Sequence, residues 1–475
     1  MKNTNKYLGL LLITALSLMI TSCEDEKYDP NPSEANLTWI KNVKMVLNGV
    51  EIQGKINENK KEIIFPKVPA NTDLSAVSFK GDLPSGAKIE EDVYDFTPDE
   101  GNSGTKRTIK IVNDNRFREY FVSINLSVPP VGAGFAQAKT YNFSMSGTLY
   151  PDFADVGEAR AADIDLEHVL IVGRNNAPHL LKIDELKQGI INPVALNQSG
   201  VTGGTFTRNA GRMIHGHIYI CNLTTGFATS SFKVYHWDKA NPDNPPIVIA
   251  DYVEADVSGE VPGGRYGDYM AMDIDQNGNG YIFSKAGSSQ ATMLRIKVSN
   301  FTTTSEPTIL SVPEVGAWST YNQVDDAPDD YLYTGYQGGV RLMNPNGQTQ
   351  YTMTTFANTN GGSARIITFN QERYLLVVNN QTTDGLITLY NVTKGETTQE
   401  ALSLFDNGDA TAKAPLYAQT MGATIPAGNN AVCVGWAKDG NDRLYILGAA
   451  ASAGFVFAEF PQAPETDPFD DFVED

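Results

Sequence analysis

Residues 273–280 have the side-chain types of a cation-binding loop. Asp273, Asp275 and Asn277 place oxygen atoms at alternate positions, and a glycine stands sixth, as in a calcium loop. The bidentate glutamate of such loops is missing at the twelfth position, where Ser284 stands. Related aspartate-rich turns at residues 325–330 and 438–442 precede other strands of the chain, which favours hairpin turns. We therefore predict no cofactor and keep calcium at this loop as the alternative.

Few residues of the chain have the types and spacing needed for catalysis. His215 and His217 would share one face of a strand, but two imidazoles need a third ligand to hold a metal, so we favour a polar inner or rim position. Cys221 and Cys433 lie in apolar strand patterns, which predicts buried thiols. No Ser-His-Asp spacing, glycine-rich phosphate loop or His-Glu-x-x-His motif occurs, so no catalytic residue is predicted.

Arginine and aromatic residues recur at comparable places in the second part of the chain. The set is Arg160, Arg212, Arg265, Tyr266, Trp318, Tyr321, Arg365 and Tyr417. We predict that these residues lie before or within the innermost strands of successive repeats, at the end of the ring where those strands begin. Aromatic rings stack on sugar rings, and arginines bond hydroxyls or carboxylates, so the set predicts a ligand site. The alternative is that the arginines pair with neighbouring acids and only satisfy buried polar groups.

These residues are positioned by a loose repeat whose clearest piece is an apolar strand after a turn. Its six copies start near Val169, Ile218, Tyr281, Tyr331, Tyr374 and Leu444. The spacings of 49, 63, 50, 43 and 70 residues mostly suit β-propeller blades with loop insertions. We predict six blades over residues 136–460. The last gap keeps seven open, although residues 428–440 are typical of an extended hairpin loop. Residues 140–145 could complete the last blade by pairing the two ends of the ring.

Residues 35–128 have short strand patterns separated by turn signals, of which Asn48-Gly49 is a strong hairpin signal. About seven such strands suggest an immunoglobulin-like β-sandwich, at the level of architecture only, because the Cys-Trp-Cys pattern is absent. A stretch rich in proline and glycine, residues 128–134, separates this part from the repeats. The predicted fold class is therefore all-β.

The N-terminus has the pattern of a secretion signal over residues 1–22. Lysines precede an apolar run at residues 8–20, which is too short to span a membrane comfortably. Thr21-Ser22 before Cys23 resembles the lipobox of bacterial lipoproteins, which implies cleavage before Cys23 and its acylation. An ordinary signal peptide with a chance cysteine is the alternative.

Residues 23–34 are charged and contain prolines, which predicts an acidic tether. Its acidic run resembles the surface-export signal of lipoproteins from Gram-negative gut bacteria; a solvated spacer is the alternative. We predict a protein in the outer membrane, attached through the lipid anchor only and facing the cell exterior.

The composition argues against nucleic acid as a partner and against zinc-cluster or disulfide-rich classes of protein. The chain has 36 Lys and Arg against 56 Asp and Glu, a net charge of −20, which would repel nucleic acid. Five histidines and three cysteines do not suffice for a zinc cluster or a disulfide scaffold. Part of the negative charge lies in an acidic tail at residues 461–475.

Taken together, lipobox, tether, sandwich and propeller resemble the two-domain surface lipoproteins that gut bacteria encode near polysaccharide-utilisation systems. The resemblance covers nearly the whole chain as architecture and implies carbohydrate handling. It carries over no catalytic residues, because the propeller family concerned is of unknown function. We predict a lipoprotein that binds a glycan at the propeller channel and assists polysaccharide uptake, with other outer-membrane uptake proteins as further partners. A propeller-type polysaccharide hydrolase or lyase, or a protein-binding scaffold, are the alternatives.

Overall fold

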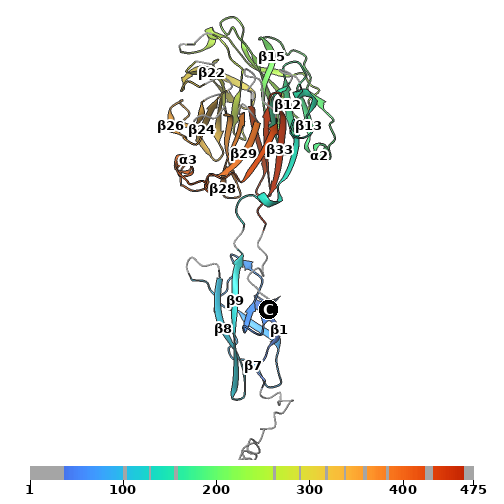
Figure 1. Ribbon diagram of the computed structural model, residues 1–475, viewed down its shortest axis with the longest axis vertical. Helices are drawn as coiled ribbons and strands as arrows, with labels where there is room; N and C mark the ends of the chain where they lie inside the picture. The colour runs from blue at the N-terminus through green and yellow to red at the C-terminus, as the bar shows by residue number, and fades with distance from the viewer. Residues whose placement is uncertain are drawn as a thin grey trace, which may run out of the picture. The chain divides into compact units, whose positions relative to one another are not determined.

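The computed structural model describes residues 37–99, 104–127, 130–154, 159–259, 261, 264–287, 290–315, 319–335, 338–356, 361–380, 385–422 and 432–464. The predicted signal peptide, Cys23, the tether and the acidic tail from residue 465 onward lie outside these residues, as does Trp318. The chain divides into two compact units, residues 1–129 with 465–475 and residues 130–464. Both are built mainly from β-strands (Figure 1).

The first unit has two sheets around one apolar core. One sheet has the order β2 (Val50–Gln53), β1 (Lys41–Leu47), β6 (Ser78–Asp82). The other has the order β3 (Lys55–Asn57), β4 (Glu62–Ile64), β9 (Arg116–Ser127), β8 (Gly104–Asn113), β7 (Lys88–Ile89), and β5 (Val68–Pro69) also pairs with β9. The hairpin predicted at Asn48-Gly49 is confirmed, because both residues have positive φ and connect Leu47 to Val50. Buried and exposed residues alternate along β8 and β9, so each of these strands turns one face to the core.

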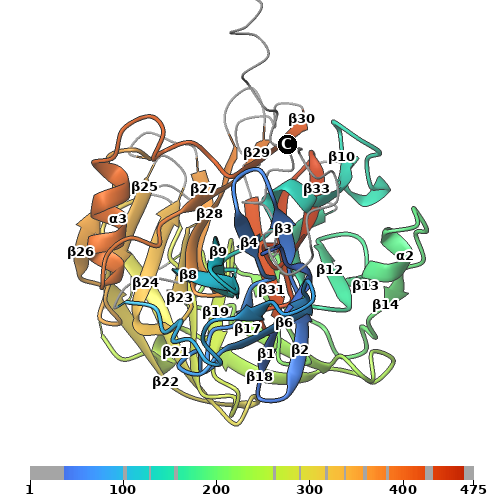
Figure 2. The ribbon, with the colours of Figure 1, turned by 90° about the horizontal axis from the view of Figure 1, so that it is seen from below.

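The second unit contains six four-stranded antiparallel sheets, called blades 1 to 6 (Figures 1 and 2). Blade 1 consists of β11 (Ala159–Ile164), β12 (His168–Gly173), β13 (His179–Lys182) and β14 (Val194–Ala195). Blade 2 consists of β15 (Phe206–Ile214), β16 (His217–Leu223), β17 (Phe232–Asp238) and β18 (Ile247–Tyr252). Blade 3 consists of β19 (Ala271–Ile274), β20 (Gly280–Lys285), β21 (Thr292–Ser299) and β22 (Thr303–Ser311).

Blade 4 consists of β23 (Thr320–Val324), β24 (Ala327–Gly335), β25 (Gly339–Met343) and β26 (Thr349–Thr352). Blade 5 consists of β27 (Gly361–Phe369), β28 (Glu372–Asn380), β29 (Gly385–Asn391) and β30 (Tyr417–Gly422). Blade 6 consists of β31 (Val432–Asp439), β32 (Arg443–Ala450), β33 (Gly454–Pro461) and β10 (Lys139–Ser144). The first strands β11, β15, β19, β23, β27 and β31 contact one another around the centre. The predicted all-β fold with a six-bladed propeller is confirmed.

The two ends of the propeller meet in blade 6, as predicted. Strand β10 pairs with β33 from Lys139 opposite Glu459 to Ser144 opposite Gly454. Two pairs of rings stack across this junction, Tyr141 with Phe457 at 4.7 Å and Phe143 with Phe455 at 5.1 Å between centroids. The junction therefore joins the ends of the ring by both a hydrogen-bonded ladder and aromatic packing.

The six apolar strands that mark the repeat are the second strands of the blades, β12, β16, β20, β24, β28 and β32. Neighbouring blades pack on both faces of such a strand, so both faces are buried. In β12, for example, the five residues Val169 to Gly173 are all buried. A strand buried on both faces has a continuous apolar run instead of alternation, which is why these segments stand out in the sequence.

The last two blades differ from the prediction. The expected loop at residues 428–440 is wrong, because Val432–Asp439 form β31, the inner strand of blade 6. The long spacing before it arises in blade 5, where helix α3 (Thr398–Asp406) is inserted between β29 and β30. Among the described residues, no helix has the length and apolar character needed to cross a membrane.

Candidate functional site

A cavity of about 680 Å³ lies where the inner strands of the propeller end. All six blades contribute to its lining, with residues Ile164, Asp165, Leu166, Arg212, Met213, Ile214, His215, Asp273, Ile274, Asp275, Gln276, Gln323, Val324, Asp325, Asp326, Pro328, Arg365, Trp436, Ala437 and Lys438. Its volume is within the range of small-molecule sites, and polar groups converge on it from different blades.

Two carboxylates in the inner strands connect successive blades. Asp163 of blade 1 accepts a bond from the backbone N–H of Met213 at 2.8 Å and pairs with Arg212 Nη1 at 3.3 Å, both from blade 2. Asp273 of blade 3 accepts from the N–H of Gln323 of blade 4 at 2.8 Å. Its other oxygen pairs with Arg365 Nη1 of blade 5 at 2.8 Å. These pairs hold the inner strands in register around the centre.

Burial controls the charge state of these groups. Burial raises the pKa of Asp163, although Arg212 and the Met213 N–H oppose it. Burial and the neighbouring Arg212 lower the pKa of Arg365, which is only 2% exposed. In the described structure, Arg365 Nε and Nη2 are buried without a hydrogen-bond partner. Because buried donors are nearly always bonded, these two are ready to bind an oxygen atom of a ligand or water.

The outer part of the cavity lining combines carboxylates, one cation and one aromatic ring. Lys438 Nζ bonds Asp325 at 2.6 Å and the Thr368 carbonyl at 2.9 Å, and it lies 5.4 Å from the Trp436 ring centroid. Burial raises the pKa of Asp325, although Lys438 opposes it. Five aspartates and three basic residues line the cavity as a whole. The lining therefore offers many acceptors, several donors and one large aromatic side chain.

The structure separates the predicted binding residues into different places. Only Arg212 and Arg365 line the cavity. Arg160 and Arg265 lie at the opposite end, where the inner strands begin. Tyr266 and Tyr321 are fully buried in the packing of the blades.

Tyr417 is not within an inner strand as predicted. It lies in β30, the outermost strand of blade 5, where its ring packs edge-on against Phe460 and its hydroxyl contacts Thr140. The error follows from the α3 insertion, which displaced the expected start of the last blade. Trp318 lies outside the described residues.

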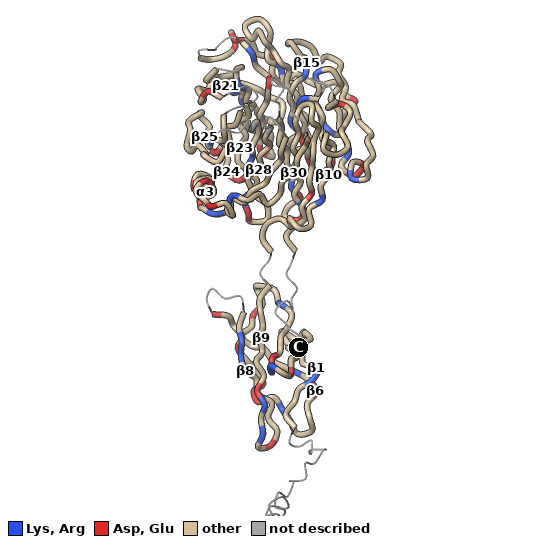
Figure 3. The backbone as a smooth tube through the Cα atoms, in the orientation of Figure 1, with Lys and Arg blue, Asp and Glu red and all other residues tan. Residues whose placement is uncertain are grey.

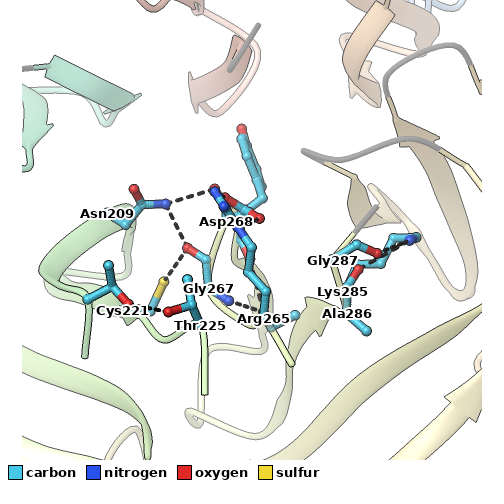
Figure 4. Close-up of polar contacts among 12 residues, drawn as sticks. Asn209, Cys221, Thr225, Arg265, Gly267, Asp268, Lys285, Ala286 and Gly287 are labelled. Atoms are coloured by element: carbon cyan, nitrogen blue, oxygen red, sulfur yellow. Dashed lines mark hydrogen bonds and ion pairs between the residues drawn. The ribbon is translucent and has the colours of Figure 1, made fainter. Parts of the chain in front are cut away.

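Most of the predicted arginines have carboxylate partners, as the pairing alternative proposed. Besides Arg212 and Arg365, Arg265 bonds both oxygens of Asp268. Asn209 Nδ2 donates to the carbonyls of Gly267 and Asp268 at 2.7 and 2.9 Å, so these residues form one connected group (Figure 4). Lys285 lies in the same region, and its Nζ donates to the carbonyls of Ala286 and Gly287 (Figure 4).

The loop at residues 273–280 forms the hairpin between β19 and β20. Its first carboxylate, Asp273, is held by Arg365 and Gln323, as described above. Asp275 accepts from the N–H groups of Asn277 and Asn279 at 2.8 and 2.9 Å. Gly278 has φ of 76°, as such a turn requires. The bonds of Asp275 are those of a hairpin turn, whereas the bonds of Asp273 join blade 3 to blades 4 and 5.

His215 and His217 do not share a strand face, contrary to the prediction. His215 and Gly216 both have positive φ and form the turn between β15 and β16. His215 Nε2 contacts the Ile274 carbonyl at 3.2 Å, whereas His217 Nδ1 contacts His236 Nε2 at 2.7 Å. The predicted burial of Cys221 and Cys433 is confirmed, with 0% and 3% exposure.

Sequence reasoning missed Trp436, Lys438 and Asp325 in the cavity lining. Trp436 and Lys438 were missed because residues 428–440 were expected to form a loop instead of the inner strand of blade 6. A usable signal does exist for the carboxylates, because Asp-Ile-Asp recurs at residues 163–165 and 273–275, at the same place in blades 1 and 3. Its first aspartate in each blade is the one that binds the next blade.

The chain matches, over residues 26–463, the family described as a domain of unknown function, DUF4623. A crystal structure of a DUF4623 family protein from Bacteroides eggerthii is 32% identical, with a TM-score of 0.73, and the match covers 90% of this chain and 99% of that one. Two weaker similarities are a quinonprotein alcohol dehydrogenase-like protein from Bacteroides thetaiotaomicron (11% identity, TM-score 0.29, covering 78% and 96%) and the WD40 β-propeller domain of Doa1 (12%, 0.34, covering 65% and 94%). No curated protein matches the chain. With the family model spanning most of its length, this chain belongs to the DUF4623 family.

Proposed function

We propose that this protein binds a neutral, hydroxyl-rich carbohydrate in the cavity at the ends of the inner strands. The observation that carries this function is the Arg365 guanidinium in the cavity lining. One of its nitrogens is held by Asp273, and two more are buried donors without a partner in the described structure. A sugar hydroxyl or ring oxygen would satisfy these donors, which are costly to leave unbonded.

The rest of the lining favours a neutral glycan over a charged one. Asp165, Asp275 and Asp326 supply acceptors for hydroxyl groups, and Gln323 supplies an amide. Trp436 offers a partly exposed ring, and sugar rings stack on such faces. With more aspartates than cations in the lining, an anionic ligand would be repelled. Basic and acidic residues both occur along the backbone of the second unit (Figure 3).

Lipid anchoring at Cys23 would place this binding protein at the outer membrane, facing the cell exterior. An acidic tether after the lipid would carry the folded units away from the membrane surface. In that position a glycan-binding propeller would act as an accessory to polysaccharide uptake, beside other outer-membrane uptake proteins. Growth of a strain carrying Cys23→Ala, with surface labelling of the protein, tests the location independently of binding.

Binding is tested with a glycan array followed by calorimetry on the best neutral oligosaccharide. We expect Trp436→Ala to weaken the affinity at least tenfold, which corresponds to about 1.4 kcal/mol. Arg365→Lys keeps a positive charge beside Asp273 but removes the open guanidinium donors, and it should weaken binding similarly. Trp39→Ala is the matched control, because Trp39 is a partly exposed tryptophan of the first unit. Unchanged affinity in both cavity variants would refute the site.

The same panel of glycans separates binding from catalysis. A binding protein leaves the oligosaccharides intact. Release of new reducing ends by the purified protein, lost in Asp325→Asn, would assign the hydrolase or lyase alternative instead.

A further inference from the structure

The two arginines of the cavity lining reach across the centre of the propeller. Arg212 Nη1 of blade 2 donates to Asp163 of blade 1 at 3.3 Å and to the Val434 carbonyl of blade 6, also at 3.3 Å. Arg365 of blade 5 pairs with Asp273 of blade 3 at 2.8 Å. These bonds join the inner strands of five blades through two guanidinium groups. We call Arg212 and Arg365 the floor of the cavity, because both line it and lie across the centre.

The space behind this floor is filled by buried side chains. Tyr269, Ser363 and Cys433 are 9%, 1% and 3% exposed. Tyr269 interacts with the side chains of Cys433 and Ser363, and also with Arg212. None of the three lines the cavity, and each precedes the cavity residues of its own blade in the chain, toward the start of the inner strand. Among the described residues, the cavity is therefore closed at its inner end.

Exposure increases from the floor to the mouth of the cavity. The side chains of Arg365 and Asp273 are only 3% and 14% exposed. Trp436 is partly exposed, and Asp275 and Asp326 are exposed. A ligand that enters the cavity therefore meets the exposed carboxylates first, then the Trp436 ring, and the Arg365 guanidinium last.

The floor has open hydrogen-bond donors at the deepest point of the cavity. Nε and Nη2 of Arg365 and Nε of Arg212 are buried without a hydrogen-bond partner in the described structure. Because a guanidinium group is planar, the N–H groups of Nε and Nη2 point the same way from one edge and fit two neighbouring oxygen atoms. Adjacent hydroxyl groups of one sugar ring provide such a pair. The deepest part of the cavity thus suits a sugar that has two neighbouring free hydroxyls.

We propose that the cavity binds the end of a glycan chain. The terminal sugar reaches the floor, where two adjacent hydroxyls accept bonds from Arg365, and the following sugar stacks on Trp436. A cavity of about 680 Å³ has the size of a small-molecule site, so it holds a few sugar units and not a length of polysaccharide. An internal sugar has chain on both sides, whereas a cavity that is closed at its inner end leaves room for chain on one side only. This inference rests on the proposed function and adds which part of the glycan is recognised.

Binding stoichiometry on chains of different length tests the recognition of chain ends. The probes are short linear oligosaccharides made from amylose, xylan and mannan, together with the parent polysaccharides, and each is titrated into the full-length protein by calorimetry. We expect the affinity to rise with the first few sugar units and then to stay constant. At saturation one protein molecule should bind per chain, whatever the length of the chain. A protein that binds internal sugars would instead occupy each chain in larger numbers as the chain lengthens.

Blocked chains show which end enters the cavity. One sample of the best-binding oligosaccharide is coupled to a carrier protein through its reducing end, and another carries a benzylidene cap on its non-reducing sugar. Blocking the end that enters should weaken the affinity at least tenfold, because the blocked sugar no longer reaches the floor. Blocking the other end should leave the affinity unchanged.

Two kinds of variant separate the contacts of the terminal sugar from those of the next one. Arg365→Lys should weaken the binding of the monosaccharide and of the longer chain by the same factor, because it removes donors at the floor. Arg212→Lys, which removes the third open donor, should show the same pattern. Trp436→Ala should weaken the binding of the longer chain only, since the terminal sugar lies beyond the Trp436 ring. Arg443→Lys is the matched control, at an arginine of blade 6 whose side chain is 44% exposed.

Failure of this inference differs from failure of the proposed function. If none of the probes binds, the proposed function is refuted and this inference with it. If glycans bind but several protein molecules occupy one chain, or if both blocked chains bind as well as the free chain, the cavity does not recognise chain ends. Glycan binding that the two floor variants and Trp436→Ala all leave unchanged would place the binding site elsewhere on the molecule.

Discussion

Asp273 of blade 3 and Arg365 of blade 5 form an ion pair of 2.8 Å across 92 residues of sequence. The other carboxylate oxygen of Asp273 accepts the N–H of Gln323 from blade 4. One aspartate therefore links three inner strands at the centre of the propeller. The side chains of Asp273 and Arg365 are 14% and 3% exposed, so the pair is shielded from solvent.

Removing Arg365 should destabilise the propeller strongly. Arg365→Met leaves Asp273 without its buried cation, and losing one partner of a buried pair costs about 3–5 kcal/mol. The double variant Asp273→Asn/Arg365→Met should recover part of that loss, because no unpaired charge is left. Urea unfolding followed by tryptophan fluorescence measures both values. Additive losses in the double variant would show that the two side chains do not interact.

Ring closure in blade 6 should depend on the aromatic stack between β10 and β33. Phe455 is fully buried and stacks on Phe143. Phe455→Ala should therefore lower the free energy of unfolding by about 3–5 kcal/mol, as for other large core deletions. Thermal unfolding by calorimetry measures the effect, and Phe117→Ala, at a 62% exposed site in the first unit, is the control. An equally small effect of both substitutions would mean that the stack contributes little.

Helix α3 should be held to blade 4 by Asp406, the last residue of the helix. Its carboxylate accepts bonds from the N–H and hydroxyl groups of Thr354 and Thr355 and from the Tyr351 hydroxyl. Burial alone would raise the pKa of Asp406, but these bonds outweigh it and lower the pKa to about 2. Asp406→Asn should cost about 1–3 kcal/mol at pH 7.

The pH dependence of this contribution follows from the lowered pKa. Stabilisation by Asp406 is fully present above its ordinary pKa of 3.8 and is lost as the pH falls from there toward 2. The difference in stability between the original protein and Asp406→Asn should therefore shrink over that interval, as measured by circular dichroism during urea unfolding. Asp409→Asn, at an exposed aspartate three residues further on, is the control. A difference that stays constant down to pH 2 would contradict the assignment.

The two described cysteines should be unreactive in the folded protein. Cys221 is fully buried, and burial raises the pKa of its thiol to about 12. Because the thiolate is the reactive form, iodoacetamide should modify Cys221 and Cys433 only after denaturation. Mass spectrometry of peptides from native and urea-treated protein measures this. Rapid labelling under native conditions would show that the strands around them open.

Periodicity predicted the blades well because their second strands are buried on both faces. Strands such as β12 and β28 contain long apolar runs, and a turn precedes each of them. The inner strands are harder to recognise, since β19 and β23 are short and mix apolar with polar residues. Helix α3 lengthens blade 5, so the inner strand of blade 6 was expected near Tyr417 instead of at Val432–Asp439. Tyr417 was therefore assigned to the wrong strand, and Trp436 was not recognised as an inner-strand residue.

The binding residues could be predicted only in part for a similar reason. The sequence does not show which carboxylate pairs with an arginine at the start of a strand. That partner decides whether the arginine only stabilises the fold or has donors left for a ligand. Arg265 meets Asp268 three residues away, but Arg365 meets Asp273 two blades away.

The sequence by itself determined the all-β class, the six repeats and the closure of the ring, because these follow from local hydrophobic patterns and turn residues. Tertiary structure alone decided which charges pair across the centre and that the cavity lies where the inner strands end. These features depend on distances between residues far apart in the chain, and no local pattern specifies such distances.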